Sequence, residues 1–409
     1  MSERVHISSL PISAPGFSLV ELLTAMALSL LLFAMTFSLV QQLDNTADVV
    51  GSAADVNENV RAAINMVSRD LSTAGQNIPV GGIPLPYGGT ATAIKLPYPT
   101  TSNFPTPAGG STLFIPVLTA GNGLGPTQGS GTNQISTDVV TMIGVNQTSN
   151  FNPTTVSTTS PHQPTISSTA ATITVSATAA GYVSAGQLIM LTNNNSSCLL
   201  AISSVNTSTG VITFTHGDST NDLLGVNQFP TLSGTGAITN GPQYGTILQL
   251  ETATVHSGNP TTTTYSWPAT LTAYPIAMVT YYLDSSTPIK DLVKLTSMGT
   301  SGCAAVSCAN VIALGINVFQ VFYSLSPPAT LNGANSDPTE NPWPTTTDTG
   351  NTPNHIVKVV LNVVGETNHK NFANSQWYSR EIKNAVTIQN LDCVNKYGTS
   401  STSTQMTQN

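Results

Sequence analysis

A run of 24 residues from Phe17 to Val40 contains one ionisable side chain, that of Glu21. As an α-helix this run would be about 36 Å long, because each residue adds about 1.5 Å. That length is enough to cross the apolar core of a lipid bilayer with some tilt. The sequence therefore predicts a helix over residues 17–40 that lies in a membrane or among equally apolar helices.

Two ordinary explanations of such a run are a signal peptide and a simple membrane anchor. A signal peptide has a charged start, a short apolar region and a cleavage site with small residues after it. Here the polar segment 1–15 comes first, no Ala-x-Ala site follows Val40, and the chain continues in a helical pattern. The order of these segments disfavours a signal peptide.

The carboxylate of Glu21 needs an explanation, because an ionisable group inside a membrane helix is costly and indicates a functional site. The run contains no Lys or Arg that could pair with it. Cleavage after Gly16 would create a cation, the α-amino group of Phe17. The carboxylate could meet this group on a neighbouring copy when two helices pack side by side. A buried pair of this kind fixes register more than it adds stability.

Residues 16–23, with the sequence GFSLVELL, resemble the cleavage and methylation motif of type IV prepilins and pseudopilins. The family pattern is a glycine, a phenylalanine, apolar residues, a glutamate at the fifth position after the cleavage site, and a long apolar helix. The resemblance implies that a prepilin peptidase removes the leader peptide 1–16 by cutting after Gly16, and that Phe17 is then N-methylated. It also implies that Glu21 aligns each subunit with its neighbours in a filament.

After Val40 the apolar pattern becomes amphipathic. Apolar residues recur at steps of three and four, which places them on one face of a helix: Val56, Val60, Ile64, Val67, Leu71 and Ala74. We therefore expect the helix to continue through residues 41–76. Gly75 is suited to end it, and Pro79 prevents its continuation.

Residues 77–395 are expected to form a β-rich globular head. Its candidate strands are 138–145, 172–178, 186–192, 199–205, 211–215, 246–251, 277–283, 317–325, 356–364 and 381–391. The last three alternate between apolar and polar residues, which indicates a half-buried antiparallel sheet. Long loops are predicted at 79–130, with room for a short strand, and at 327–353, and a disordered tail at 396–409. The predicted fold class is α+β, with a long N-terminal helix packed on an antiparallel β-rich head.

The order of these segments extends the resemblance. It resembles the order in the PilW class of minor pilins and, more distantly, in the J-type pseudopilins. The segments in question are, in chain order, the helix end, TDVVTMIGV, GQLIMLT, VFQVFYSL and VTIQNL. The resemblance implies a type IV pilin-like fold and a low-copy subunit at or near the pilus tip that helps to initiate assembly, with adhesion, twitching motility or DNA uptake. Two alternatives are a pseudopilin of a type II secretion system and a tip adhesin that binds a surface or glycan through its long loops.

Partners and location follow from the same resemblance. The expected partners are the prepilin peptidase, other major and minor pilins through the N-terminal helix, and the inner-membrane assembly platform. Before assembly, the chain would cross the inner membrane once with its head outside the cytoplasm. After assembly it would belong to the extracellular pilus.

Composition points to a surface protein rather than a nucleic-acid-binding one. Charged residues make up 7% of the chain, against about 25% in typical domains. The net charge of −8 and a total of 11 Lys and Arg argue against a basic surface for phosphates. The six histidines are scattered, and neither a nucleophile elbow nor a phosphate-binding loop occurs. We therefore expect no enzymatic activity, cofactor or metal.

Two weak motifs have ordinary explanations. Asp218-x-Thr220-x-Asp222 partly resembles a calcium loop, but its glycine and distal glutamate are misplaced, so a solvated turn is expected. Four N-x-S/T sequons are expected to arise by chance in a chain so rich in these residues.

The four cysteines are Cys198, Cys303, Cys308 and Cys393. An even number in an exported chain is compatible with two disulfides, and four cysteines allow three connectivities. Cys303 and Cys308 are close enough to close a small loop, which would leave Cys198 to pair with Cys393. Reduced, buried thiols are the alternative.

Overall fold

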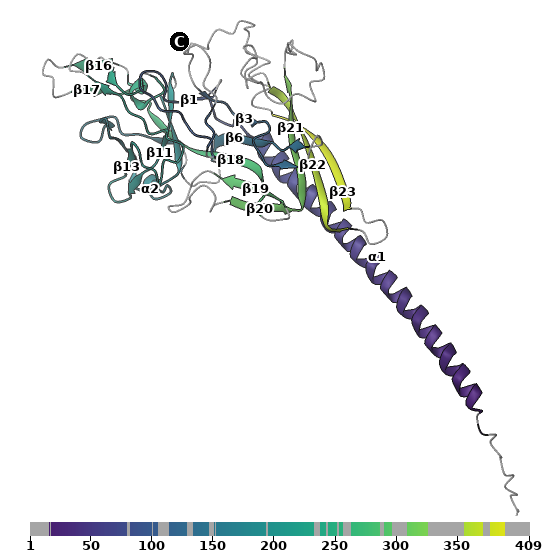
Figure 1. The fold of residues 1–409 in the computed structure, drawn as a ribbon. Helices are drawn as coiled ribbons and strands as arrows, with labels where there is room; N and C mark the ends of the chain where they lie inside the picture. Colours follow the sequence, from purple (N-terminus) through teal and green to yellow (C-terminus); the bar gives the residue numbers. More distant parts are fainter. Residues whose placement is uncertain are drawn as a thin grey trace, which may run out of the picture.

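The structure is a computed structural model. It describes residues 16, 18–79, 82–99, 101–104, 114–128, 134–146, 151, 153–193, 195–232, 238–242, 244–251, 253–256, 263–286, 290–296, 309–325, 356–370 and 377–388. A long helix projects from a β-rich head (Figure 1). The expected α+β architecture, a long N-terminal helix with a large antiparallel β-rich region, is confirmed at this level.

The helix α1 (Leu19–Thr73) has 55 residues and is therefore about 80 Å long. It continues without interruption through Gly51. Ala74 follows the last helical residue, and Gly75 then takes the left-handed conformation with φ +76°, which ends the helix as the sequence predicts. The backbone N–H of Gly75 donates to the carbonyl of Ile143 at 2.8 Å, so the helix end is tied to the head.

The largest sheet has eight antiparallel strands: β3 (Leu118–Gly121), β6 (Val139–Val145), β7 (Thr154–Thr155), β10 (Leu188–Thr192), β11 (Ser197–Ala201), β18 (Thr272–Asp284), β19 (Asp291–Thr296) and β20 (Ala309–Leu314). The central strand β18 is long enough to hold two pairs of neighbours. Along one edge it pairs with β7 and β6, and along the other with β10 and β19.

A second sheet consists of β21 (Ile316–Leu325), β22 (Ile356–Lys370) and β23 (Trp377–Thr387). It packs against the C-terminal half of α1 (Figure 1). The alternation predicted for these strands is observed, since Val359, Leu361 and Val363 all face the core. Gly365 on β22 lies so close to the helix that an added Cβ would overlap the side chain of Val60.

Asp138 joins the two sheets. Its backbone N–H donates to the Phe319 carbonyl at 2.9 Å, and its carboxylate accepts hydrogen bonds from the N–H groups of Val321 at 2.8 Å and Gly123 at 2.9 Å. Burial raises the pKa of the Asp138 carboxyl, although the two hydrogen bonds act in the opposite direction. The Phe319 carbonyl and the Val321 N–H of β21 thereby gain hydrogen-bond partners.

The remaining elements form smaller units in the head. They are β1 (Ile83–Pro84), β2 (Phe114–Ile115), β4 (Thr127–Gln128), β5 (Ile135–Ser136), β8 (Thr165–Ile166), β9 (Ala170–Thr174), α2 (Ala177–Ala180), β12 (Ser204–Asn206), β13 (Val211–Thr215), β14 (Thr231–Leu232), β15 (Ile238–Asn240), η2 (Ile247–Leu250), β16 (Ala253–His256) and β17 (Thr263–Ser266). The strands β12, β13, β9 and β8 form a four-stranded sheet, and the others pair in twos.

The structure corrects several sequence predictions. The described part of segment 79–130 is mostly loop, as predicted, but it contains the four short strands β1 to β4 instead of one, and buried side chains such as Ile83 and Leu85. Strands of two to four residues are too short to show alternation. Segment 246–251 is not a strand but holds the 3₁₀ helix η2, whose buried Ile247 and Leu250 are three residues apart, one turn of such a helix.

Two other predicted strands also differ from the structure. The end of 172–178 belongs to the short helix α2, and 199–205 divides between β11 and β12, which lie in different sheets. Local apolar patterns do not show where a chain passes from one sheet to the next. The leader residues 1–15, the loop 327–353 and the tail 396–409 lie outside the described residues.

One core joins the helix to both sheets. It includes Val56, Val60, Ala63, Ile64, Val67, Leu71, Leu118, Val140, Tyr281, Phe319, Val359 and Leu361. The predicted apolar face of the helix is thus confirmed. Three further clusters occur among the described residues: around β9 to β13, around β1, β2 and β10, and a small one of Val139, Tyr282, Val293 and Leu295.

Leu71 provides a test of this core. Leu71→Ala should lower the free energy of unfolding by about 2–5 kcal/mol, because the side chain is completely buried and its loss leaves a cavity. Met66→Ala, at a 39% exposed position of the same helix, should change it by about 0.5 kcal/mol at most. Urea unfolding of the detergent-solubilised full chain would measure both. Equal effects would contradict the described packing.

Candidate functional site: the exposed part of α1

The N-terminal part of α1 has no contact with the head that would bury it. From Leu19 to Asp55 no side chain is buried, and the helix stands away from the head in Figure 1. Large apolar side chains are exposed along it, including Leu22, Leu23, Met26, Leu28, Leu31, Phe33, Met35, Phe37 and Val40. An exposed apolar surface of this extent requires cover from lipid or from other helices.

Among the residues that the structure describes, α1 is the one helix long and apolar enough to cross a membrane. Its most apolar 18-residue window has a mean hydropathy of 2.2, and none of that window is buried. The sequence-based prediction of a spanning helix over 17–40 agrees with this exposure.

The motif residues lie at the start of this helix. Gly16 is exposed and outside the helix, with open space where a side chain would be. Glu21 is exposed in the first turn, where a carboxylate is favoured by the helix dipole. Within the described part of the chain its carboxylate has no ion-pair partner. Phe17, the predicted cleavage and methylation residue, lies outside the described residues.

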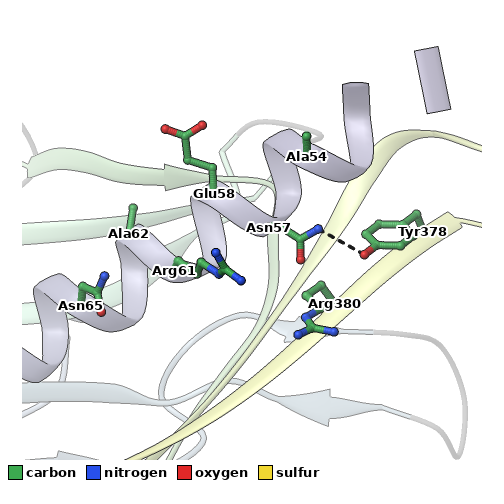
Figure 2. A pocket seen from close by; sticks show the side chains of 8 residues that line it. All are labelled: Ala54, Asn57, Glu58, Arg61, Ala62, Asn65, Tyr378 and Arg380. Carbon is green, nitrogen blue, oxygen red and sulfur yellow. Dashed lines mark hydrogen bonds between the residues drawn. The ribbon is translucent and has the colours of Figure 1, made fainter. Parts of the chain in front are cut away.

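A groove lies between residues 54–65 of α1 and the start of β23 (Figure 2). Arg61 from α1 and Arg380 from β23 both line it, and both are exposed. Along its wall the side-chain amide of Asn57 donates to the hydroxyl of Tyr378 at 3.3 Å. Glu58 also lines the groove, but in Figure 2 its carboxylate points away from the two arginines. Sequence reasoning missed this groove, because its residues are far apart in the chain.

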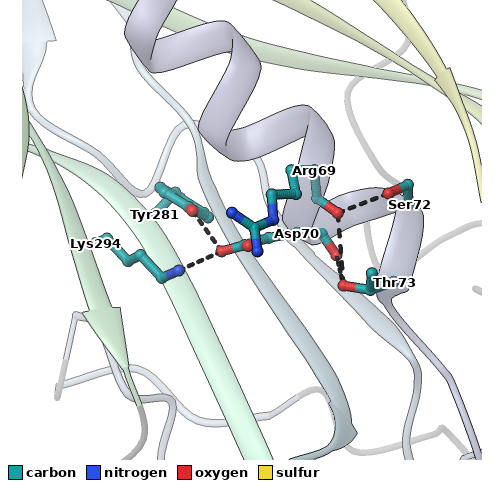
Figure 3. A network of polar contacts seen from close by, with 6 residues as sticks. All are labelled: Arg69, Asp70, Ser72, Thr73, Tyr281 and Lys294. Atoms are coloured by element: carbon teal, nitrogen blue, oxygen red, sulfur yellow. Dashed lines mark hydrogen bonds and ion pairs between the residues drawn. The ribbon is translucent and has the colours of Figure 1, made fainter. Parts of the chain in front are cut away.

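A polar network holds the end of α1 to the head (Figure 3). The carboxylate of Asp70 accepts a hydrogen bond from the Tyr281 hydroxyl at 2.6 Å and forms an ion pair with Lys294 at 2.5 Å. Burial, followed by the hydrogen bond and charge of Asp70, raises the pKa of Tyr281 far above its usual range. The tyrosine therefore stays protonated and acts as a donor. The network fixes the last turn of α1 to β18 and β19.

The structure describes one of the four cysteines. Cys198 lies on β11 as a free thiol with no exposed surface, in the core around β9 to β13. Burial raises its pKa well above the usual range. Cys198 thus has the form of the alternative, a reduced and buried thiol. Cys303, Cys308 and Cys393 themselves lie outside the described residues.

The segment around Asp222 is a hydrogen-bonded turn. Both oxygens of the Asp222 carboxylate accept backbone hydrogen bonds, from Gly225 at 3.0 Å, Val226 at 2.9 Å and Asn227 at 2.7 Å. Burial outweighs these bonds and raises the pKa of Asp222 to about 6. Asp218 caps the preceding turn by accepting from the Thr220 and Asn221 N–H groups at 3.1 Å. Backbone contacts thus account for both carboxylates.

The polar network generates one prediction. Tyr281→Phe should lower the free energy of unfolding by about 1.5–3 kcal/mol, the range for a hydrogen bond to a charged group. Tyr182→Phe, at a 46% exposed position, is the matched control and should have almost no effect. Urea unfolding of the full chain measures the difference. A Tyr281→Phe variant as stable as the control would contradict the role of this contact.

Asp222 generates a prediction about pH. Its pKa is about 6 in the folded chain and about 4 in the unfolded chain, so the folded chain binds more protons between these values. The free energy of unfolding therefore falls as pH rises from about 4 to 6, by roughly 3 kcal/mol for this group. Asp222→Asn should remove this slope.

Asp218 is the control for this measurement. Burial is the largest single effect on the Asp218 carboxyl and raises its pKa, but the hydrogen bonds from Asn221, Ser203 and Thr220 together outweigh burial and lower the pKa. Asp218→Asn should therefore lower the free energy of unfolding by a constant amount above about pH 4 and change its pH dependence only below about pH 4, where the wild-type chain loses the contribution of Asp218 as pH falls. Urea midpoints measured from pH 3 to 7 test both variants. An Asp222→Asn variant with the same slope between pH 4 and 6 as the wild-type chain would show that other groups cause it.

Comparison with known proteins adds no relative to these observations. No family model, curated protein or solved structure matches the chain. The function must therefore be inferred from the residues at the start of α1 and from the exposure of that helix.

Proposed function

We propose that this protein is a minor subunit of a type IV pilus, anchored in the inner membrane through α1 until it enters the filament. The observation that carries the proposal is a helix whose apolar side chains are all exposed from Leu19 to Val40, with Gly16 just before its start and Glu21 in its first turn. The role is structural, and we propose no reaction for the chain.

The physical steps follow from that helix. In the membrane, lipid covers its apolar surface. A prepilin peptidase would cut after Gly16, which is exposed outside the helix, and the new α-amino group of Phe17 would be methylated. In the filament, the apolar surfaces of neighbouring helices would cover one another. Glu21, which has no ion-pair partner within the described part of the chain, would meet the α-amino group of a neighbour.

The size of the head supports a position at or near the tip. After cleavage 409 − 16 = 393 residues remain, most of them in the head. A subunit of this bulk is poorly suited to dense repetition along a shaft. At the tip it would help to initiate assembly, and its head would be displayed for adhesion, motility or DNA uptake.

The test is intact-mass and N-terminal analysis of the chain from native membranes and from sheared filaments. We expect a chain that begins at methylated Phe17 and is present in filaments. A chain that retains Met1, or one cut beyond Val40, would overturn the proposal. A correctly processed chain that occurs only with a secretion apparatus would identify a pseudopilin instead.

Glu21 generates a further prediction. Glu21→Gln should leave cleavage after Gly16 intact but reduce the amount of the chain in filaments at least about tenfold, because truncating one partner of a buried charge pair is costly. Glu381→Gln, which removes an exposed carboxylate from the head, should have no such effect. Immunoblots of membrane and filament fractions would measure both. Normal incorporation of Glu21→Gln would refute the pairing.

A further inference from the structure

The arginines of the groove between α1 and β23 have no acidic partner in the described part of the chain. Neither Arg61 nor Arg380 forms an ion pair there. Figure 2 shows both side chains directed into the same groove, from different elements. Two exposed guanidinium groups that converge in this way form a surface suited to carboxylates.

An exposed apolar stripe leads into this groove. Positions at steps of three, four and seven lie on one helix face: Leu43, Ala47, Val50, Ala54, Arg61 and Asn65. This face differs from the one that packs on the head. Leu43 is 60% exposed and Val50 is 63% exposed. The stripe and the groove therefore form one continuous uncovered surface.

A complementary acidic stripe lies on another face of the same helix. Its members are Asp44, Asp48, Asp55 and Glu58, at steps of four, seven and three. All four are exposed, and none forms an ion pair among the described residues. The helix contains no Lys or Arg before Arg61. One helix thus carries both a basic, partly apolar face and an acidic face.

The part of α1 between the apolar run and the head is also not stabilised by packing against the rest of the described chain. Residues 41–55 include no buried side chain. The segment 45–52, NTADVVGS, consists mostly of residues with low helix propensity. An isolated helix of this composition is marginal in water, because helical stability in proteins comes mainly from packing. This part of α1 is therefore suited to a partner that covers it.

We propose that the arginines of the groove bind Asp55 and Glu58, from the acidic stripe of α1, of a second copy of this chain packed in parallel. This rests on the proposed function, which aligns neighbouring subunits in one direction. Because the two surfaces differ, the contact is heterologous: each copy contributes a different surface to it. A lipid headgroup is out of reach, since Arg61 lies 21 residues, or about 30 Å, beyond the end of the apolar run at Val40.

The register of this contact agrees with that of Glu21. Consider two parallel copies that start at the same height. To bring Asp55 of the second copy level with Arg61 of the first, the second copy must move six residues, or about 9 Å, toward the head. To bring its Phe17 level with Glu21, it must move four residues, or about 6 Å, in the same direction. The long arginine side chain can span a difference of about 3 Å. One arrangement of two copies therefore satisfies both pairs.

Cysteine cross-linking between two tagged full-length copies tests the contact. One copy carries Asp55→Cys and the other Arg380→Cys, and a short bifunctional maleimide is added to membrane and filament fractions. The control is Glu381→Cys, because neighbouring residues of a strand point to opposite faces. Parent chains without the introduced cysteines, treated with the same maleimide, give the background from the four native cysteines. We expect a doubly tagged dimer at least about fivefold more abundant with Arg380→Cys than with Glu381→Cys.

Charge reversal tests the chemistry of the same contact. Arg61→Glu combined with Arg380→Glu should reduce co-purification of the two copies about fivefold. Asp55→Arg combined with Glu58→Arg in the other copy should restore it. Unchanged urea midpoints would show that the variants still fold. Equal cross-linking at the control position, cross-links only to a different protein, or a reversal without effect or restoration would each overturn the proposal.

N-terminal analysis of the same fractions separates this inference from the pilus proposal. A chain that is cut after Gly16 and enters filaments, but gives no specific cross-link, would refute the groove contact alone. A specifically cross-linked chain that retains residues 1–16 would refute the pilus proposal alone.

Discussion

The burial of one face of α1 in the core of the head is the contact on which the rest of the structure depends. Val60, Val67 and Leu71 have no exposed surface, and Gly365 allows β22 to approach the helix closely. The ion pair of Asp70 with Lys294 and the hydrogen bond from Tyr281 then fix the last turn. Because this half of the helix is held so firmly, the other half projects as a straight stalk with its apolar surface uncovered.

Some of the few charged residues of the chain lie at structural junctions. Charged residues make up only 7% of the sequence, yet Asp138 connects the two sheets and Asp222 organises a turn through three backbone hydrogen bonds. A buried carboxylate is costly unless it is hydrogen-bonded, so each is retained where it satisfies several backbone groups at once. The head therefore consists of many short strands, and a small number of buried carboxylates connect its segments through backbone hydrogen bonds.

The sequence predicts those parts of the fold that have one buried face. Steps of three and four residues identify the buried half of the helix, and alternation identifies β21 to β23. It does not predict the short strands of 79–130, whose burial depends on distant neighbours. The motif at Gly16 and Glu21 is local and can be read directly. The groove is not, because Arg61 and Arg380 are 380 − 61 = 319 positions apart, and the pair of Asp70 and Tyr281 is 211 apart.

The long seam between α1 and the head has a mechanical consequence. Buried residues of the helix extend from Val56 to Ala74, a distance of about 27 Å along its axis. A tension applied to the stalk would load this seam in shear, so that many side-chain contacts share the force instead of yielding one after another. The ion pair at Asp70 lies near the far end of the seam, where it resists the helix sliding out of the head.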